Sequence, residues 1–213
     1  KFLWVAYDSD FVSSTSGQWI NDNSTAILEA VGSHVYGEPT ALYDIQENVA
    51  DQSYRTISNV TSDDAFVADI VSGVTRVMMH SPTVLYGSNS TSPGENVSAV
   101  ELETNSLDNV YPLLYSSPAA QIQDGDAQDP FVHDDSDIGS FVTATIEVDA
   151  GDDGTGVIVV SGSKMLGGYH PMIDYFYDPE VMDGDVLVRQ TIDFGMETAM
   201  YIPPTSTDTT TTN

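Results

Sequence analysis

The chain has 213 residues, which is enough for one domain with a substantial hydrophobic core. It carries 33 Asp and Glu residues against five Lys and Arg, giving a formal net charge of -28. This balance argues against nucleic acid and anionic membrane surfaces as partners, because both attract clustered Lys and Arg. The absence of cysteine excludes disulfides, thiolate metal sites and a cysteine nucleophile.

The acidic charge is distributed through a sequence that is otherwise typical of a folded protein. Hydrophobic residues make up 40% of the chain, so the composition predicts a folded domain with an acidic surface. Self-repulsion destabilises such a surface at low salt, whereas in molar salt the Debye length falls to about 3 Å. The charge therefore favours a protein of concentrated brine. A divalent-cation binder and an acidic extracellular protein of ordinary salinity are the competing explanations.

The first half of the chain predicts short elements separated by polar loops. A nearly all-apolar strand over 2–7 is typical of a parallel sheet that is covered on both faces. A helix is predicted over 25–31, with its N-cap at Asn23 or Ser24 and its end at Gly32. A polar stretch with little periodicity then runs to position 51. Further extended segments are predicted at 35–36, 75–79, 83–86, 99–103 and 110–115.

The second half contains the stronger patterns. Alternating residues over 141–148 predict a half-buried strand, and a tight hairpin connection over 149–156 leads into an apolar strand over 157–160. Apolar residues at helical spacing predict an amphipathic helix over 185–199. The order of elements predicts an α/β domain over 1–200 with a mixed, largely parallel sheet flanked by helices. Residues 201–213 are rich in Pro and Thr and predict a stalk or linker.

Six segments along the chain carry a family resemblance. In order they are Lys1–Val5, Ile27–Gly32, Pro82–Gly87, Tyr111–Pro118, Gly139–Ala144 and Gly156–Ser163. Together they resemble the class I glutamine-amidotransferase-like domain of gliding-motility-type ABC transport auxiliary proteins and of secreted multidomain proteins of haloarchaea. The resemblance implies an amidotransferase-like or flavodoxin-like fold whose N-terminal β-α unit is missing here. Without a cysteine, it implies a non-catalytic binding or scaffolding module.

Histidines and serines provide few catalytic patterns. The four histidines show no zinc-binding helical spacing: His34, His80, His133 and His170. His133 and His170 could belong to a spatial constellation, although exposed loop imidazoles are the simpler interpretation of both. Ser161 and Ser163 follow an apolar strand, but neither has the flanking glycines of a nucleophile elbow. A serine hydrolase with His80 or His170 as its base is the weaker alternative.

Acidic loops offer a better candidate site. Asp124, Asp126 and Asp129 could wrap a calcium ion, with further acids close behind at 134, 135 and 137. A second, weaker group lies at 149, 152 and 153, and the competing interpretation of both is a solvated acidic surface. Asp8 and Asp10 follow the first strand, where open α/β sheets place ligands. Six aromatic residues could line a sugar platform, although a buried core is the simpler interpretation: Trp4, Trp19, Tyr169, Tyr175, Phe176 and Tyr177.

Several sequence features favour an extracellular location. Four Asn-x-Ser/Thr sequons occur, at Asn23, Asn59, Asn89 and Asn96. No signal peptide and no membrane-spanning run is evident, and the start at Lys1 on a strand indicates a mature or proteolysed piece of a larger protein. We therefore expect a non-catalytic structural or binding domain of a haloarchaeal secreted or cell-surface glycoprotein, with other modules or chains of that protein as partners. The alternative is a fragment of a secreted hydrolase whose metal or serine site is completed by an upstream segment.

Overall fold

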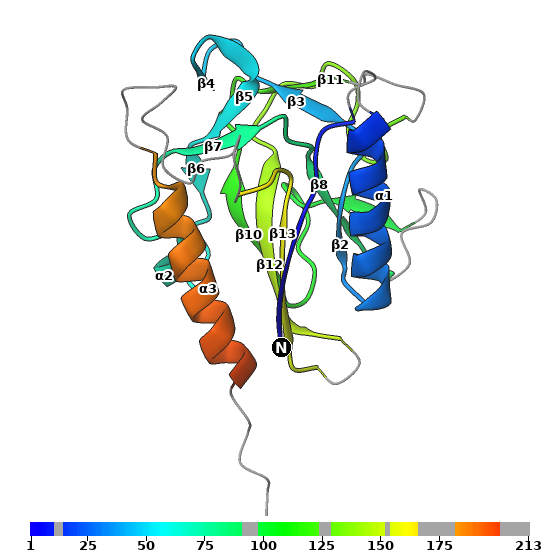
Figure 1. The fold of residues 1–213 in the computed structure, drawn as a ribbon, viewed down its shortest axis with the longest axis vertical. Coiled ribbons are helices and arrows are strands. Elements are labelled where there is room, and N and C mark those ends of the chain that lie inside the picture. The colour runs from blue at the N-terminus through cyan, green and yellow to red at the C-terminus, as the bar shows by residue number, and fades with distance from the viewer. Residues whose placement is uncertain (11–14, 91–97, 124–128, 152–153, 166–181, 201–213) are drawn as a thin grey trace, which may run out of the picture.

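The computed structural model describes residues 1–10, 15–90, 98–123, 129–151, 154–165 and 182–200. These residues form thirteen strands in four sheets, together with three helices (Figure 1). The largest sheet has five strands in the order β1-β13-β12-β10-β6. Its strands are β1 (Phe2–Ala6), β6 (Val60–Thr61), β10 (Val110–Tyr115), β12 (Val142–Ala150) and β13 (Gly156–Ser161).

The predicted largely parallel sheet flanked by helices is wrong. Only β1 and β13 pair in parallel, with Phe2 opposite Val157 and Ala6 opposite Ser161, and the other strand pairs of the described residues are antiparallel. A parallel pair needs a crossover connection of about a dozen residues or more, whereas β12 turns directly into β13. The hairpin connection that the sequence predicts between these strands therefore already required an antiparallel pair.

Three smaller sheets surround the central one. The first combines β2 (Val35–Gly37), β8 (Leu85–Ser88) and β9 (Ala99–Glu101); the second β4 (Asn48–Val49), β5 (Gln52–Ser58) and β7 (Val77–His80); the third β3 (Ala41–Tyr43) and β11 (Gln121–Gln123). The strands between positions 41 and 61 were not predicted. Most are two or three residues long, so their sequence shows no periodicity, and partners elsewhere in the chain complete them.

Helices lie on both sides of the central sheet. Helix α1 (Thr15–Ala30) covers one side, and α2 (Ala68–Val71) and α3 (Gly184–Met200) lie on the other (Figure 1). The helix predicted over 185–199 is confirmed by α3, but α1 begins ten residues earlier than predicted and places Asn23 and Ser24 inside the helix. Among the described helices, none is long and apolar enough to cross a membrane.

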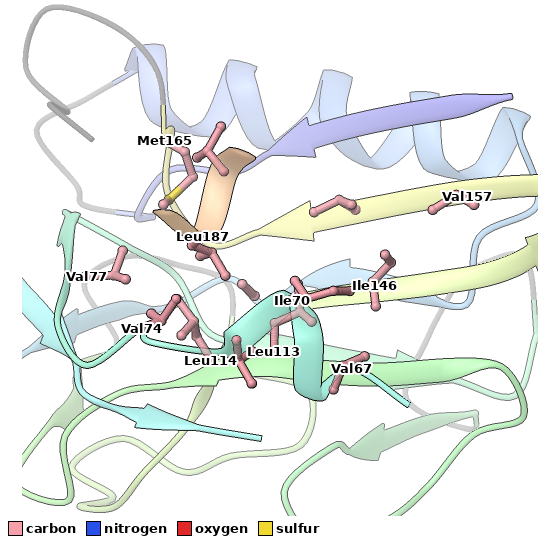
Figure 2. Packing of buried hydrophobic residues seen from close by; sticks show 14 of the residues in the cluster. Val67, Ile70, Val74, Val77, Leu113, Leu114, Ile146, Val157, Met165 and Leu187 are labelled. Carbon is pink, nitrogen blue, oxygen red and sulfur yellow. The ribbon is translucent and has the colours of Figure 1, made fainter. Parts of the chain in front are cut away.

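The faces of the central sheet belong to two separate cores. Val157 and Val159 of β13 pack with Ile70 of α2 and Leu187 of α3 (Figure 2), whereas Ile158 and Val160 face the core beneath α1. Strand β12 lies inside the sheet and is buried at every position except Asp149. The prediction of a half-buried strand there was therefore wrong, because both of its faces are covered.

Candidate functional site

Three loops meet at the carboxyl ends of the parallel pair β1 and β13. The amide of Ser9, in the loop after β1, donates to the Ser81 carbonyl (2.8 Å) in the turn after β7. In the loop after β13, the Ser163 hydroxyl donates to the His80 carbonyl (2.8 Å) and accepts from the His80 amide (3.2 Å). These bonds hold residues from distant parts of the sequence against one another.

The turn and the loop after β13 approach each other closely at Gly162. The Thr83 amide donates to the Gly162 carbonyl (3.0 Å), and a Cβ on Gly162 would lie 2.1 Å from the Thr83 carbonyl oxygen. Only glycine allows this contact. Within the same turn, Ser81 has a φ of 45°, a left-handed conformation that is strained for a residue with a side chain.

Charged and aromatic side chains gather at this junction, and we call them the carboxyl-end cluster. Its members are Asp8, Tyr54, Arg55, His80 and Lys164. Lys164 Nζ lies 3.0 Å from Asp8 Oδ2, and Arg55 of β5 is the direct cross-strand partner of His80 of β7. The Tyr54 ring packs edge-on against the His80 ring (centroids 5.3 Å apart), and Arg55 Cζ lies 5.4 Å from the Tyr54 centroid.

Its surroundings lower the pKa of His80. Burial makes the largest contribution, and the positive charges of Arg55 and Lys164 act in the same direction, while Asp8 opposes them. Since an ordinary histidine titrates near 6.5, the lowered pKa leaves His80 neutral at pH 7.

The two serines after β13 have structural partners. Ser161 Oγ accepts from Trp4 Nε1 (3.1 Å) and donates to the Ser163 carbonyl (2.8 Å). Ser163 Oγ bonds to the main chain of His80 and not to its ring. The described residues therefore form no nucleophile-base pair between these serines and His80, and His170 lies outside them.

A second histidine belongs to a buried ion cluster. His133 is 8% exposed, so the prediction that it is an exposed loop imidazole was wrong. Its Nδ1 lies 2.5 Å from Glu38 Oε2, and its Nε2 lies 3.4 Å from Glu103 Oε2. Glu38 Oε1 also accepts the amides of Phe131 (2.6 Å), Val132 (2.7 Å) and His133 (3.1 Å). This cluster ties the acidic loop after β11 to the segment after β2.

The two carboxylates determine the charge of His133. Burial alone would lower the pKa of its imidazole, but the hydrogen bonds and charges of Glu103 and Glu38 outweigh burial and raise the pKa to about 10. His133 is therefore protonated at neutral pH and neutralises part of the carboxylate charge beside it.

A third histidine, His34, pairs with Glu147 of β12. Its Nδ1 lies 2.8 Å from Glu147 Oε1, and its side chain is 39% exposed. Glu147 Oε2 accepts the Ser33 hydroxyl (2.8 Å) and the His34 amide (3.1 Å). The serine thus donates to the carboxylate and not to the imidazole, which is an arrangement that holds a buried acid in place.

A cavity of about 240 Å³ opens between α1 and the strands beside it. Asp10, which is 7% exposed, lines this cavity, whereas the Asp8 carboxylate forms an ion pair with Lys164. Asn21 of α1 bonds to both main-chain groups of Asp8, accepting from its amide (2.9 Å) and donating to its carbonyl (2.8 Å). The lining residues are Asp10, Asn21, Asp22, Thr25, Ala26, Glu29, Gly37, Glu38, Pro39, Tyr86 and Phe131.

The predicted calcium site falls mostly outside the described residues. Asp124 and Asp126 lie outside them, and Asp129 is exposed. In the loop that follows, the Asp134 amide donates to Asp137 Oδ2 (2.9 Å). Within the part of the chain that the structure describes, no group of three or more His, Cys, Asp or Glu could hold a metal ion.

The sequons differ in exposure. Asn23 of α1 and Asn89 are exposed, Asn59 is half-buried with a buried Oδ1, and Asn96 lies outside the described residues.

The predicted aromatic platform is not assembled by the aromatics that are described. Trp4 is half-buried in β1 and Trp19 is exposed on α1, while the other four lie outside the described residues.

Sequence reasoning missed the acids and the arginine that complete these clusters. Glu38, Glu103 and Glu147 had no local pattern, because their partners are far away in the chain. Arg55 and Lys164 could have been found from their rarity among so many acids.

In the comparisons with known proteins, no family model, curated protein or solved structure matches the chain. The resemblance to amidotransferase-like domains stays a prediction.

Proposed function

We propose that this chain is a non-catalytic structural or binding domain of a haloarchaeal secreted or cell-surface glycoprotein, whose partners are other modules or chains of the same protein. The observation that supports it most is the distribution of the carboxylates. Exposed acids lie on loops, on helices and near the end of β12 throughout the described residues: Asp22, Glu29, Glu47, Asp51, Asp63, Asp64, Asp69, Asp108, Asp129, Asp134, Asp135, Asp137, Asp149, Asp193 and Glu197.

Three of the buried acids, in contrast, are matched by donors: Glu38, Asp44 and Glu147. Glu38 and Glu147 are paired with histidines and main-chain amides, as described above. Asp44 Oδ1 accepts the amides of Gln46 (2.7 Å) and Glu47 (2.8 Å), and its Oδ2 accepts the Ser117 hydroxyl. The unmatched negative charge is therefore at the surface, where salt screens it. This arrangement suits a domain whose solvent is brine.

Thermal unfolding between 0.1 M and 2 M KCl tests the proposal. We expect the melting temperature to rise steeply across this range, because screening removes the repulsion among the exposed acids. A matched variant replaces Asp63, Asp108, Asp193 and Glu197 by their amides, and it should depend less on salt. A flat salt profile of the unmodified chain would contradict the proposal.

Calcium binding by the acidic loop is the second part of the proposal, with Asp124, Asp126 and Asp129 as ligands. Its support is the spacing of carboxylates in one short loop, since calcium takes six to eight oxygen ligands. Isothermal titration with CaCl₂ in 2 M KCl should give saturable heat, which is lost when these three residues become Asn. Heats that do not saturate would remove calcium from the proposal without affecting the salt argument.

A further inference from the structure

The cavity beside α1 has a negatively charged wall. Its acids are Asp10, Asp22, Glu29 and Glu38, and the lining residues that the structure describes include no Lys or Arg. Glu38 is already engaged by His133 and by main-chain amides of the acidic loop. The negative charge that a ligand can meet therefore comes mainly from α1.

One face of α1 forms this part of the wall. Asp22, Thr25, Ala26 and Glu29 follow the i, i+3, i+4, i+7 spacing that places residues on one side of a helix. Asp22 and Glu29 are exposed, and within the described residues neither carboxylate has an ion-pair or hydrogen-bond partner. Seven residues span about 10 Å along a helix axis. Two unpaired carboxylates thus stand at the ends of a stripe whose middle contains the small side chain of Ala26.

Another part of the wall contains a buried hydroxyl without a partner. Tyr86 of β8 lines the cavity and is 4% exposed, and among the described residues its hydroxyl makes no hydrogen bond. The nearby Tyr7 hydroxyl, in contrast, bonds with Thr25 Oγ1 (2.9 Å). Buried polar groups are normally paired, because an unpaired one keeps the cost of its lost hydration. A polar ligand in the cavity supplies the missing partner.

The wall also offers apolar surface. The Phe131 ring packs edge-on against the Tyr86 ring, with centroids 5.4 Å apart, and Ala26 and Pro39 lie on the same wall. Burial raises the pKa of Tyr86, and nearby glutamates act in the same direction, so its hydroxyl is neutral and can accept from a cationic N–H. Carboxylates beside aromatic and aliphatic surface suit an organic ammonium ion. A bare metal ion fits less well, since the described residues contain no group of three acids or histidines that could hold one.

We propose that this cavity binds a small aliphatic diamine, with its two ammonium groups at Asp22 and Glu29 and its carbon chain across Ala26. An N–H of the ligand donates to the Tyr86 hydroxyl. Alkylammonium groups titrate near pH 10, so both ends of the ligand are charged at neutral pH. The proposal names a ligand for the binding role proposed above and rests on that role.

Isothermal titration of the full chain with 1,4-diaminobutane, at pH 7.5 in 0.5 M KCl, tests the proposal. We expect saturable heat. The monoamine 1-aminobutane, which carries a single ammonium as a lysine side chain does, should bind about tenfold more weakly because it reaches one carboxylate only. The neutral 1,4-butanediol should give no saturable heat.

Variants of the wall locate the binding. Asp22→Ala and Glu29→Gln should each weaken binding of the diamine about tenfold. Tyr86→Phe keeps the ring and should weaken it several-fold, whereas Ala26→Leu fills the cavity without a change of charge and should abolish it. Glu197→Gln is the matched control, since it removes the same charge from α3 on the other side of the central sheet (Figure 1) and should bind as the unmodified chain does.

Three results would each overturn the proposal. The first is the absence of saturable heat with the diamine up to about 10 mM. The second is equal binding by the diamine and the monoamine, and the third is equal weakening by Glu29→Gln and Glu197→Gln, which indicates general attraction to an acidic surface. The salt dependence of thermal unfolding is a separate measurement, so failure here is distinguishable from failure of the function proposed above.

Discussion

Glu38 Oε2 lies 2.5 Å from His133 Nδ1, and both side chains are almost completely buried. The two residues are 95 positions apart, so this ion pair fastens the acidic loop to the segment that follows β2. Three main-chain amides at 131–133 converge on the other oxygen of the same carboxylate. A single buried acid thus organises a loop that consists largely of surface acids.

We expect Glu38→Gln to destabilise the fold by about 3–5 kcal/mol, because removing one partner of a buried ion pair leaves the other uncompensated. Denaturant unfolding in 2 M KCl measures the loss. Glu197→Gln, at an exposed position of α3, is the control and should change the free energy of unfolding by less than about 0.5 kcal/mol. Equal effects of the two substitutions would show that the pair contributes little.

His133 should also make stability depend on pH. Because its pKa is raised to about 10 in the folded chain, the stabilisation is complete below the unfolded value of about 6.5. It declines as pH rises towards 10, by up to about 1.4 kcal/mol per pH unit, since unfolding then releases a proton. Unfolding free energies between pH 6 and 10 should therefore fall more steeply for the unmodified chain than for His133→Gln. Parallel profiles would contradict the raised pKa.

Close packing at Gly162 predicts a specific sensitivity to added volume. Gly162→Ala should lower the free energy of unfolding by about 1–3 kcal/mol, because the added Cβ would overlap the main chain at Thr83. That main chain cannot move without breaking the turn. Gly139→Ala is the control, since its nearest neighbour is a Phe141 ring carbon at an ordinary 3.6 Å. Thermal unfolding of both variants compares them, and a neutral Gly162→Ala would mean that the loop shifts freely.

The exposure of the sequons predicts which of them carry glycans. Asn89 is exposed, whereas Asn59 is half-buried, and its inaccessible Oδ1 is bonded to the same carbon as the Nδ2 that would carry a glycan. Peptide mass spectrometry of the native protein should find glycan at Asn89 and none at Asn59. A modified Asn59 would contradict the burial of that side chain, and unmodified peptides at every sequon would count against a cell-surface location.

Sequence patterns predicted the elements that have a clear apolar pattern of their own. Strands β1 and β13 were found because each is a continuous apolar run, and helix α3 because its apolar residues recur at helical spacing. The first half of α1 was missed, since residues 15–24 are polar or small apart from Trp19 and Ile20, and these two form no apolar stripe. The fold class was wrong because strand direction depends on connections, and a short hairpin between β12 and β13 outweighs the apolar character of β1.

The candidate sites depended even more on long-range pairing. Asp8, His80 and Ser163 were each noticed in the sequence, but nothing local indicates that they meet. Their meeting follows from the register of β5 against β7 and from the parallel pairing of β1 with β13. Such registers are selected by packing in the folded chain, and a single sequence does not display them.

Asp183, the residue before α3, contacts the segment before β7. Asp183 Oδ2 accepts the Thr75 amide (2.8 Å), the Thr75 hydroxyl (2.6 Å) and the Arg76 amide (3.1 Å). Burial alone would raise the pKa of this carboxyl, but the bonds from Thr75 and Arg76 outweigh it and lower the pKa. The stabilisation is therefore present at neutral pH and is lost as pH falls through the lowered pKa of the folded chain.

We expect Asp183→Ala to lower the free energy of unfolding by about 1–2 kcal/mol at pH 7. The loss should be smaller for Asp183→Asn, because the amide keeps an acceptor oxygen. Denaturant unfolding at pH 7 and again at pH 3 measures both the loss and its disappearance in acid. Asp193→Ala, on the exposed face of the same helix, is the matched control. A loss at Asp183 that persists unchanged at pH 3 would show that packing of α3, and not the charged acceptor, stabilises this end of the helix.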